Sequence, residues 1–174
     1  MSAPLYIETA RLRIRWLQPD DADFIYRLVN DPDWLRHIGD RKVGDLAEAR
    51  AYIENGALAM YRRIGFGLNH VALKTDDTAI GICGLLRRDE LPCSDLGYAL
   101  LPEFRNRGYA LEAARAILQH GCTTLAQTLV CAIVSADNPA SIRLLDKLGF
   151  HFDRQILLPP GSDPVDLYSI QLAE

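Results

Sequence analysis

Long apolar segments are missing from this chain of 174 residues. No apolar stretch approaches the ~20 residues that a membrane-spanning helix requires. The N-terminus also lacks the charged and apolar regions of a secretory signal peptide. We therefore expect a cytoplasmic protein that does not associate with membranes.

Cysteine and histidine are scarce, and neither is spaced as a metal ligand. The sequence has four of each, without a C-x-x-C motif and without a second ligand at helical spacing from any histidine. Two cysteines fall within apolar runs, which favours reduced thiols in the core of a cytosolic protein. The sequence therefore predicts no metal site, and reduced thiols at Cys83, Cys93, Cys122 and Cys131.

An excess of positive charge is also absent. The formal net charge is −4, which argues against non-specific nucleic-acid binding and is compatible with a cationic substrate. Hydrophobic residues make up 49% of the chain and charged residues 24%, as in an average soluble protein that buries a full core. We expect a single domain over residues 1–174, acting as a monomer or a homodimer.

The apolar pattern predicts a mixed α/β fold. Strands are expected near residues 11–17, 66–74, 79–86, 95–101, 128–134, 150–157 and 165–172, and helices near 19–28, 45–53, 110–118 and 139–148. The alternation of strand and helix in the second half requires a parallel strand pair flanking the helix after Gly108. Arg11, Arg13 and Arg15 lie in register on one strand and are interpreted as a solvated face, with a partner site as the alternative.

The most informative segment lies between Leu100 and Glu112. A strand ends before Pro102, and a loop rich in arginine leads directly into a strongly helical sequence. The start of a helix offers free N–H groups and partial positive charge, and glycine permits close approach, so this loop is suited to a phosphate or pyrophosphate. An ordinary strand-to-helix connection with solvated arginines remains the alternative. The loop reads Arg105-Asn106-Arg107-Gly108-Tyr109-Ala110.

Two common phosphate-binding motifs are missing from this loop. It has no terminal Lys-Ser/Thr, as a P-loop has, and it lacks the three-glycine spacing of a dinucleotide fingerprint. The sequence therefore argues against an enzyme that hydrolyses nucleotides or transfers hydride.

A second segment, residues 138–150, also has a clear local logic. Asn138 is suited to cap a helix, Pro139 to its first turn, and Gly149 to the left-handed position after its end. Capping alone explains Asn138, and a first-turn hydroxyl alone explains Ser141. Together with the arginine-rich loop, the two residues favour a binding site.

Both segments resemble one family. Residues 105–110 are similar to the R/Q-x-x-G-x-G/A pyrophosphate loop of the GNAT superfamily of acyl-CoA N-acetyltransferases, and residues 138–150 to its N-x-x-S-x-x-x-x-x-x-x-G-F segment. Asn106 stands where the family commonly has glycine, and asparagine tolerates a left-handed backbone. The resemblance implies the GNAT fold: a mixed, mostly antiparallel sheet with a central splayed parallel pair and helices on both faces.

The resemblance also implies the ligand and the reaction. Acetyl-CoA is the expected acetyl donor, with its pantetheine arm beside the backbone of Ala99 and Leu100 and with Asn138 at the cofactor. The residues implied to hold its pyrophosphate are Arg105, Asn106, Arg107, Gly108, Tyr109 and Ala110. The family transfers the acetyl group directly to a primary amine, which agrees with the lack of a Ser-His-Asp or Cys-His signature here.

The acid and base are less clearly marked. The tyrosine that many relatives use is missing from Leu144-Leu145-Asp146. In the branch of ribosomal-protein N-terminal acetyltransferases, a serine at the place of Ser141 is the proposed proton donor. Asp95 is our candidate base, with a solvated acid as its alternative interpretation, and His70 is a second candidate that a core histidine would also explain.

The kind of acceptor amine is inferred from the lack of an obvious strong base. A peptide α-amine has a pKa near ~8, against ~10.4 for lysine, so it needs less help to deprotonate. We therefore expect a protein or peptide N-terminus. A small amine (polyamine, amino acid or antibiotic) and a catalytically silent CoA-binding module remain open. The helices near residues 20–60 and the loop 159–163 are expected to shape the acceptor pocket.

Overall fold

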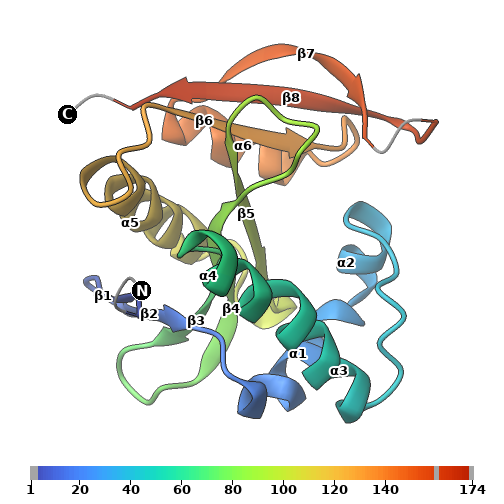
Figure 1. The fold of residues 1–174 in the computed structure, drawn as a ribbon, viewed down its shortest axis with the longest axis vertical. Helices are drawn as coiled ribbons and strands as arrows, with labels where there is room; N and C mark the ends of the chain where they lie inside the picture. Colours follow the sequence, from blue (N-terminus) through green and yellow to red (C-terminus); the bar gives the residue numbers. More distant parts are fainter. Residues whose placement is uncertain (1–3, 159–160, 173–174) are drawn as a thin grey trace.

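The computed structural model describes residues 4–158 and 161–172, which form a mixed sheet (Figure 1). The strands lie in the order β1-β2-β3-β4-β5-β6-β8-β7, and every neighbouring pair is antiparallel except β5 and β6. The predicted mixed, mostly antiparallel sheet is confirmed. The strands are β1 (Tyr6–Glu8), β2 (Leu12–Trp16), β3 (Leu68–Leu73), β4 (Ala79–Leu86), β5 (Ser94–Leu100), β6 (Leu129–Val134), β7 (His151–Leu157) and β8 (Pro164–Gln171).

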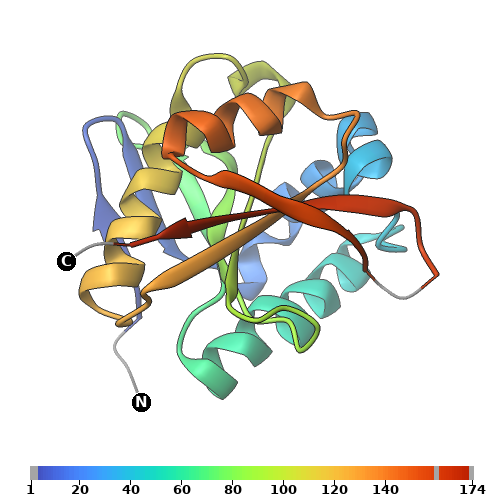
Figure 2. The same cartoon turned by 90° about the horizontal axis from the view of Figure 1, so that it is seen from above.

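Helices cover both faces of the sheet, as the resemblance implied (Figure 2). On one face, α5 (Tyr109–Thr123) packs on β2, β4 and β5, and α6 (Pro139–Leu148) packs on α5 and β6. The other face carries α1 (Ala22–Val29), α2 (Pro32–His37), α3 (Leu46–Ile53) and α4 (Ala59–Ile64). None of the helices in the described part of the chain is long and apolar enough to cross a membrane.

The central parallel pair is splayed. β4 pairs with β5 from Gly81–Leu100 to Leu86–Asp95, whereas β5 pairs with β6 only at Ser94–Val130 and Asp95–Cys131. Because β6 stays paired with β8 over its whole length, the two strands diverge beyond Asp95. The edge of β5 that faces β6 therefore has backbone groups available to a ligand.

Two short elements were not predicted. β1 is a three-residue strand at the edge of the sheet, and α2 has six residues, so neither is long enough to show a periodic pattern. The start of α2 is nevertheless well defined, because the side chain of Asp31 accepts hydrogen bonds from the backbone N–H groups of Asp33 and Trp34, and Pro32 occupies its first turn. The helix predicted at 45–53 also continues further, through a π-helical segment (Glu54–Leu58) into α4.

The expectation of four reduced thiols is wrong for one pair. Cys93 and Cys131 form a disulfide with an S–S distance of 2.06 Å. The register of the parallel strands explains it: Asp95 pairs with Cys131, and Cys93, two residues before Asp95, lies diagonally across from Cys131 with a Cα–Cα distance of 6.2 Å. A pattern along the chain does not show this register. Cys83 is a buried thiol, and its burial raises its pKa to about 12.

The disulfide is expected to stabilise the fold. It joins residues 38 positions apart, and closing a loop of this length restricts the unfolded chain. Reduction should lower the free energy of unfolding by about 2–4 kcal/mol. Denaturant titration with and without a reductant measures this change. In the double variant Cys93→Ser/Cys131→Ser the reductant should not change the unfolding transition. An unfolding transition of the wild type that is the same with and without the reductant would contradict the prediction.

Candidate active site

A cleft of about 1570 Å³ opens where β5 and β6 diverge. Its walls come from both helical layers and from the central strands, so it joins segments that lie far apart in the sequence. Most of the predicted site residues line it: Asp95, Ala99, Leu100, Arg105, Asn106, Gly108, Tyr109, Ala110, Asn138 and Ser141. Of the remaining candidates, neither Arg107 nor His70 is among the lining residues.

The arginine-rich loop has the backbone expected of an anion receptor. Asn106 and Gly108 both adopt left-handed conformations, with φ of 59° and 80°. Asn106 therefore takes the conformation that glycine commonly provides at its position. Helix α5 begins at Tyr109, and no side chain of the described residues caps it. Its first N–H groups are thus available to an anion at the edge of the cleft.

A residue outside the loop holds it in place. The Arg11 guanidinium donates to the carbonyl of Arg107 at 2.9 Å and to the Glu112 carboxylate at 2.7 Å, and it lies 4.5 Å from the centre of the Tyr109 ring. Burial opposes the charge on Glu112, but hydrogen bonds from Thr9 and Arg11 outweigh it and lower the Glu112 pKa. Interpreting Arg11 as part of a solvated strand face missed this role.

Arg105 connects the loop to α2. Its guanidinium donates to Asp31 at 2.6 Å, to Asp33, and to the carbonyl of Leu100 at 3.0 Å. The side chain therefore anchors the start of α2 rather than projecting alone into the cleft, and its contact with a phosphate stays a prediction. Arg107 is exposed, and its side chain makes no ion pair with a residue of the described ranges.

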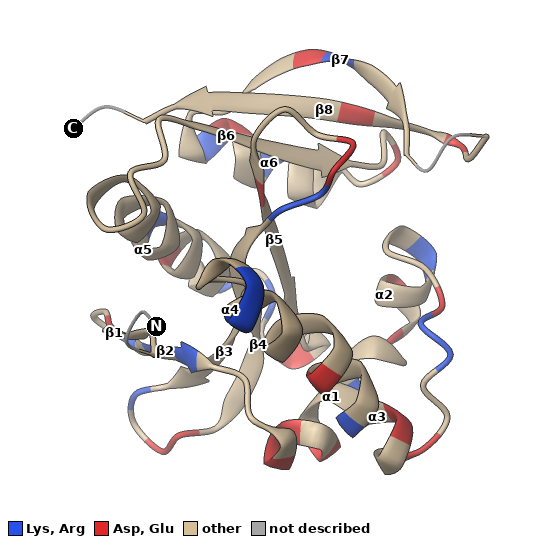
Figure 3. Ribbon diagram, in the orientation of Figure 1, with Lys and Arg blue, Asp and Glu red and all other residues tan. Residues whose placement is uncertain are grey.

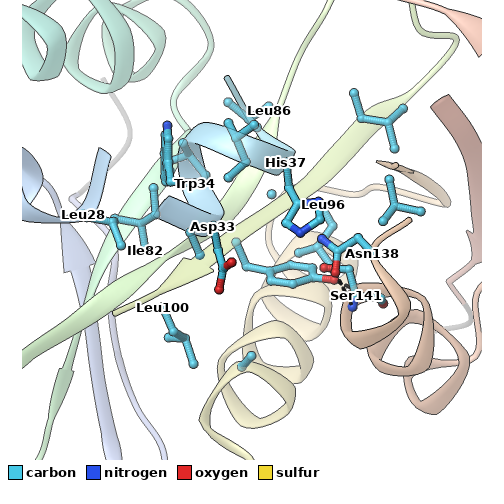
Figure 4. A pocket seen from close by; sticks show the side chains of 18 of the residues that line it. Leu28, Asp33, Trp34, His37, Ile82, Leu86, Leu96, Leu100, Asn138 and Ser141 are labelled. Carbon is cyan, nitrogen blue, oxygen red and sulfur yellow. Dashed lines mark hydrogen bonds between the residues drawn. The ribbon is translucent and has the colours of Figure 1, made fainter. Parts of the chain in front are cut away.

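The other wall of the cleft is the start of α6. The side chain of Asn138 accepts a hydrogen bond from the backbone N–H of Ser141 at 3.2 Å, which confirms its capping role. The Tyr98 hydroxyl donates to the backbone carbonyl of Ser141 at 3.4 Å, and burial raises the Tyr98 pKa to about 12. Figure 4 shows Asn138 and Ser141 side by side at the cleft. Both contacts to Ser141 use its backbone, so they leave its hydroxyl uncommitted.

The two candidate bases lie in different places. Asp95 is 1% exposed, which excludes a solvated acid, and its carboxylate pairs with Arg88 at 3.1 Å. Burial raises the Asp95 pKa, while the Arg88 charge opposes the shift. His70 is buried beside Phe24 and 3.8 Å from Asp21, and burial lowers its pKa to about 4. The interpretation of His70 as a core histidine is confirmed.

The helices near residues 20–60 line the opposite side of the cleft, as expected. Trp34, His37 and Tyr52 contribute from α2 and α3. Burial raises the Tyr52 pKa, and the charges of Arg41 and Arg88 oppose the shift. Arg41 and Arg88 bring positive charge to this side of the cleft from the α2–α3 and β4–β5 loops. Figure 3 shows basic residues in blue on both loops. Of the predicted loop 159–163, residues 159 and 160 lie outside the described ranges.

The chain is similar to known acetyltransferases over nearly its whole length. YoaA of Bacillus subtilis (strain 168), an uncharacterized N-acetyltransferase, is 30% identical over 172 residues, which cover 94% of this chain and 95% of that protein. An acetyltransferase from Agrobacterium tumefaciens strain C58 has a TM-score of 0.81 at 26% identity, covering 99% of this chain and 96% of that one. RimL, a ribosomal L7/L12 alpha-N-protein acetyltransferase solved with coenzyme A, has a TM-score of 0.83 at 15% identity, covering 97% and 98%. At 15% identity, the similarity to RimL establishes a shared fold alone.

The family assignment rests on the sequence as well as on the fold. Residues 11–151 match the acetyltransferase (GNAT) domain family, and this range includes the arginine-rich loop, Asn138 and Ser141. The chain therefore belongs to the GNAT superfamily and is an N-acetyltransferase.

Proposed function

We propose that this enzyme transfers the acetyl group of acetyl-CoA to the α-amine of a protein or peptide N-terminus. The observation that carries the proposal is that the uncapped start of α5 and the hydroxyl-bearing start of α6 line one cleft. The first suits the pyrophosphate and the second the thioester end of one extended molecule. RimL, with which this chain shares its fold, acts on a protein N-terminus.

The cleft fits acetyl-CoA on three counts. The N–H groups at the start of α5 and the loop 105–110 supply donors and positive charge for a pyrophosphate. The edge of β5 that is not paired with β6 includes Ala99 and Leu100 and supplies backbone groups for the amides of the pantetheine arm, and the Leu100 carbonyl also accepts from Arg105. Asn138 keeps its side-chain N–H₂ group for the cofactor, because its oxygen caps α6.

In the proposed reaction, Ser141 donates a proton to the departing thiolate. Its side chain lines the cleft on the first turn of α6. A backbone N–H on the open edge of β5 polarises the thioester carbonyl, as oxyanion donors do. Asp95 lies on the same face of β5 as Ala99, toward the helices α1–α4.

The α-amine acceptor has a direct test. At pH 7 a peptide α-amine, with a pKa near ~8, is deprotonated more than 100 times as often as a lysine with a pKa near ~10.4. We expect kcat/KM for a peptide with a free N-terminus to exceed that for an Nα-blocked lysine peptide by roughly 100-fold. Release of the CoA thiol with a panel of both peptides, polyamines and amino acids measures the preference.

The same assay separates the alternatives. A preference for polyamines or amino acids would replace the peptide acceptor with a small amine. Binding of acetyl-CoA without thiol release for any amine would identify a silent CoA-binding module and contradict the proposed function.

A further inference from the structure

Helix α2 crosses the cleft and is tied to both of its walls. At its start, Asp31 and Asp33 pair with Arg105 of the proposed pyrophosphate loop. At its end, Arg36 donates to Asp137 in the loop before α6 at 3.2 Å. A side chain on the inner surface of this helix is therefore held in a defined place over the cleft, which is the condition for precise chemistry.

The last residue of α2 is such a side chain. His37 lines the cleft, and its side chain is only 16% exposed. Its ring points toward Asn138 and Ser141 across the opening (Figure 4). Its Nδ1 is buried 3.6 Å from Oδ1 of Asp137, without a hydrogen-bond partner among the described residues.

A buried nitrogen without a partner calls for an explanation. Catalytic hydrogen bonds are often long before a substrate binds and tighten in the complex. When Nδ1–H donates to a carboxylate, the imidazole keeps Nε2 as its proton acceptor. His37 and Asp137 are placed for this arrangement, because Nδ1 faces Oδ1 of Asp137. Nε2 of His37 makes no hydrogen bond with a residue of the described chain, so it is available to accept a proton.

The other candidate bases are less well placed. His70 is enclosed in the core away from the cleft lining. Asp95 lies in the cleft, but both of its oxygens accept from Nε of Arg88, at 3.2 and 3.1 Å. His37 therefore offers a proton acceptor without a hydrogen-bond partner among the described residues, in the part of the cleft that holds Asn138 and Ser141 (Figure 4).

We propose that His37 is the base of the acetyl transfer and that Asp137 orients it; this rests on the proposed function. Nε2 of His37 takes one proton from the acceptor ammonium, and the freed electron pair forms the C–N bond with the thioester carbon. As the C–S bond breaks, Ser141 gives its proton to the thiolate and recovers one from the amide nitrogen. His37 then returns its proton to water, so the transfer needs no further reactant.

The charged and titratable groups around this imidazole come from several elements. Asp137 faces it from the loop before α6, Arg36 shares its helix, and the hydroxyl of Tyr98 comes from β5. Farther along the same cleft are Asp33, Arg41, Arg88, Asp95, Arg105, Arg143 and Lys147.

The test compares the pH dependence of the wild type with that of His37→Asn and His37→Gln on a peptide α-amine. At pH 7 we expect kcat to fall by at least about 10-fold, because only about one in ten amines with a pKa near ~8 is then deprotonated, with KM for acetyl-CoA nearly unchanged. The rate of each variant should rise with a midpoint near ~8, the ionisation of the amine itself, because only free amine then reacts. The wild type should stay active below pH ~8. Above that pH, the difference in kcat between the wild type and each variant should become smaller.

Arg36→Gln is the matched control. Arg36 contacts the same Asp137 from the same helix, so this variant loosens α2 but keeps the imidazole. Its kcat should fall less than that of His37→Asn, and its rate should keep the wild-type pH dependence. Equal losses in Arg36→Gln and His37→Asn would overturn the proposal in favour of a structural role for α2. Wild-type kinetics in both His37 variants, with loss in Asp95→Asn, would assign the base to Asp95. A wild type inactive toward every amine would overturn the proposed function together with this inference.

Discussion

In the Gly108→Glu variant, coenzyme A should no longer raise the melting temperature of the protein. Gly108 precedes α5 with φ of 80°, and a Cβ there would lie 3.3 Å from Nη2 of Arg11. The new side chain brings bulk and negative charge to the N–H groups proposed to hold the pyrophosphate. For the wild type, a ligand at 100 times its Kd stabilises the native state by about 2.7 kcal/mol. We expect the variant to lose at least about 100-fold in affinity, which lowers this stabilisation to about 0.4 kcal/mol or less.

Gly108→Ala is the control for backbone strain. Alanine must adopt the same positive φ but adds no charge. The free energy of unfolding of this variant should therefore be about 1 kcal/mol lower than that of the wild type, and coenzyme A should still raise its melting temperature. Thermal unfolding with and without coenzyme A compares the variants. A full shift in Gly108→Glu would refute the pyrophosphate site at this loop.

The Ser141→Ala variant should lose about 100- to 10,000-fold in kcat, the range expected for a general acid. Its affinity for coenzyme A should stay within about threefold, because a proton donor to the thiolate acts only in the transition state. This substitution removes the hydroxyl without removing any other contact of Ser141. Asn138 and Tyr98 both contact the backbone of Ser141, so removing the hydroxyl leaves the cap of α6 and the link to β5 intact.

Steady-state kinetics and direct binding of coenzyme A separate the possible roles of this hydroxyl. Ser141→Thr keeps a hydroxyl and should recover part of the activity. Weaker binding of coenzyme A with unchanged kcat would give Ser141 a cofactor-holding role instead. Unchanged kinetics in Ser141→Ala would show that its hydroxyl takes no part in the reaction.

Local features of the sequence determined the order of most elements and the core of the candidate site. Apolar periodicity marks a strand or helix within a few residues, which is why β2 to β8 and the longer helices were predicted. The left-handed Asn106 and Gly108 and the cap at Asn138 also depend on neighbouring residues alone. The splayed parallel pair was expected from the family resemblance, and the register of β5 and β6 confirmed it.

Contacts between distant segments were decided only by the tertiary structure. Arg11 meets Glu112 across 101 positions, and Arg105 meets Asp31 across 74. The disulfide from Cys93 to Cys131 depends on the register of two strands joined by a helix. His37 reaches the cleft because α2, too short to predict, is tied to both walls. Local patterns extend over one or two turns or a strand, whereas these contacts arise only when the sheet brings its far parts together.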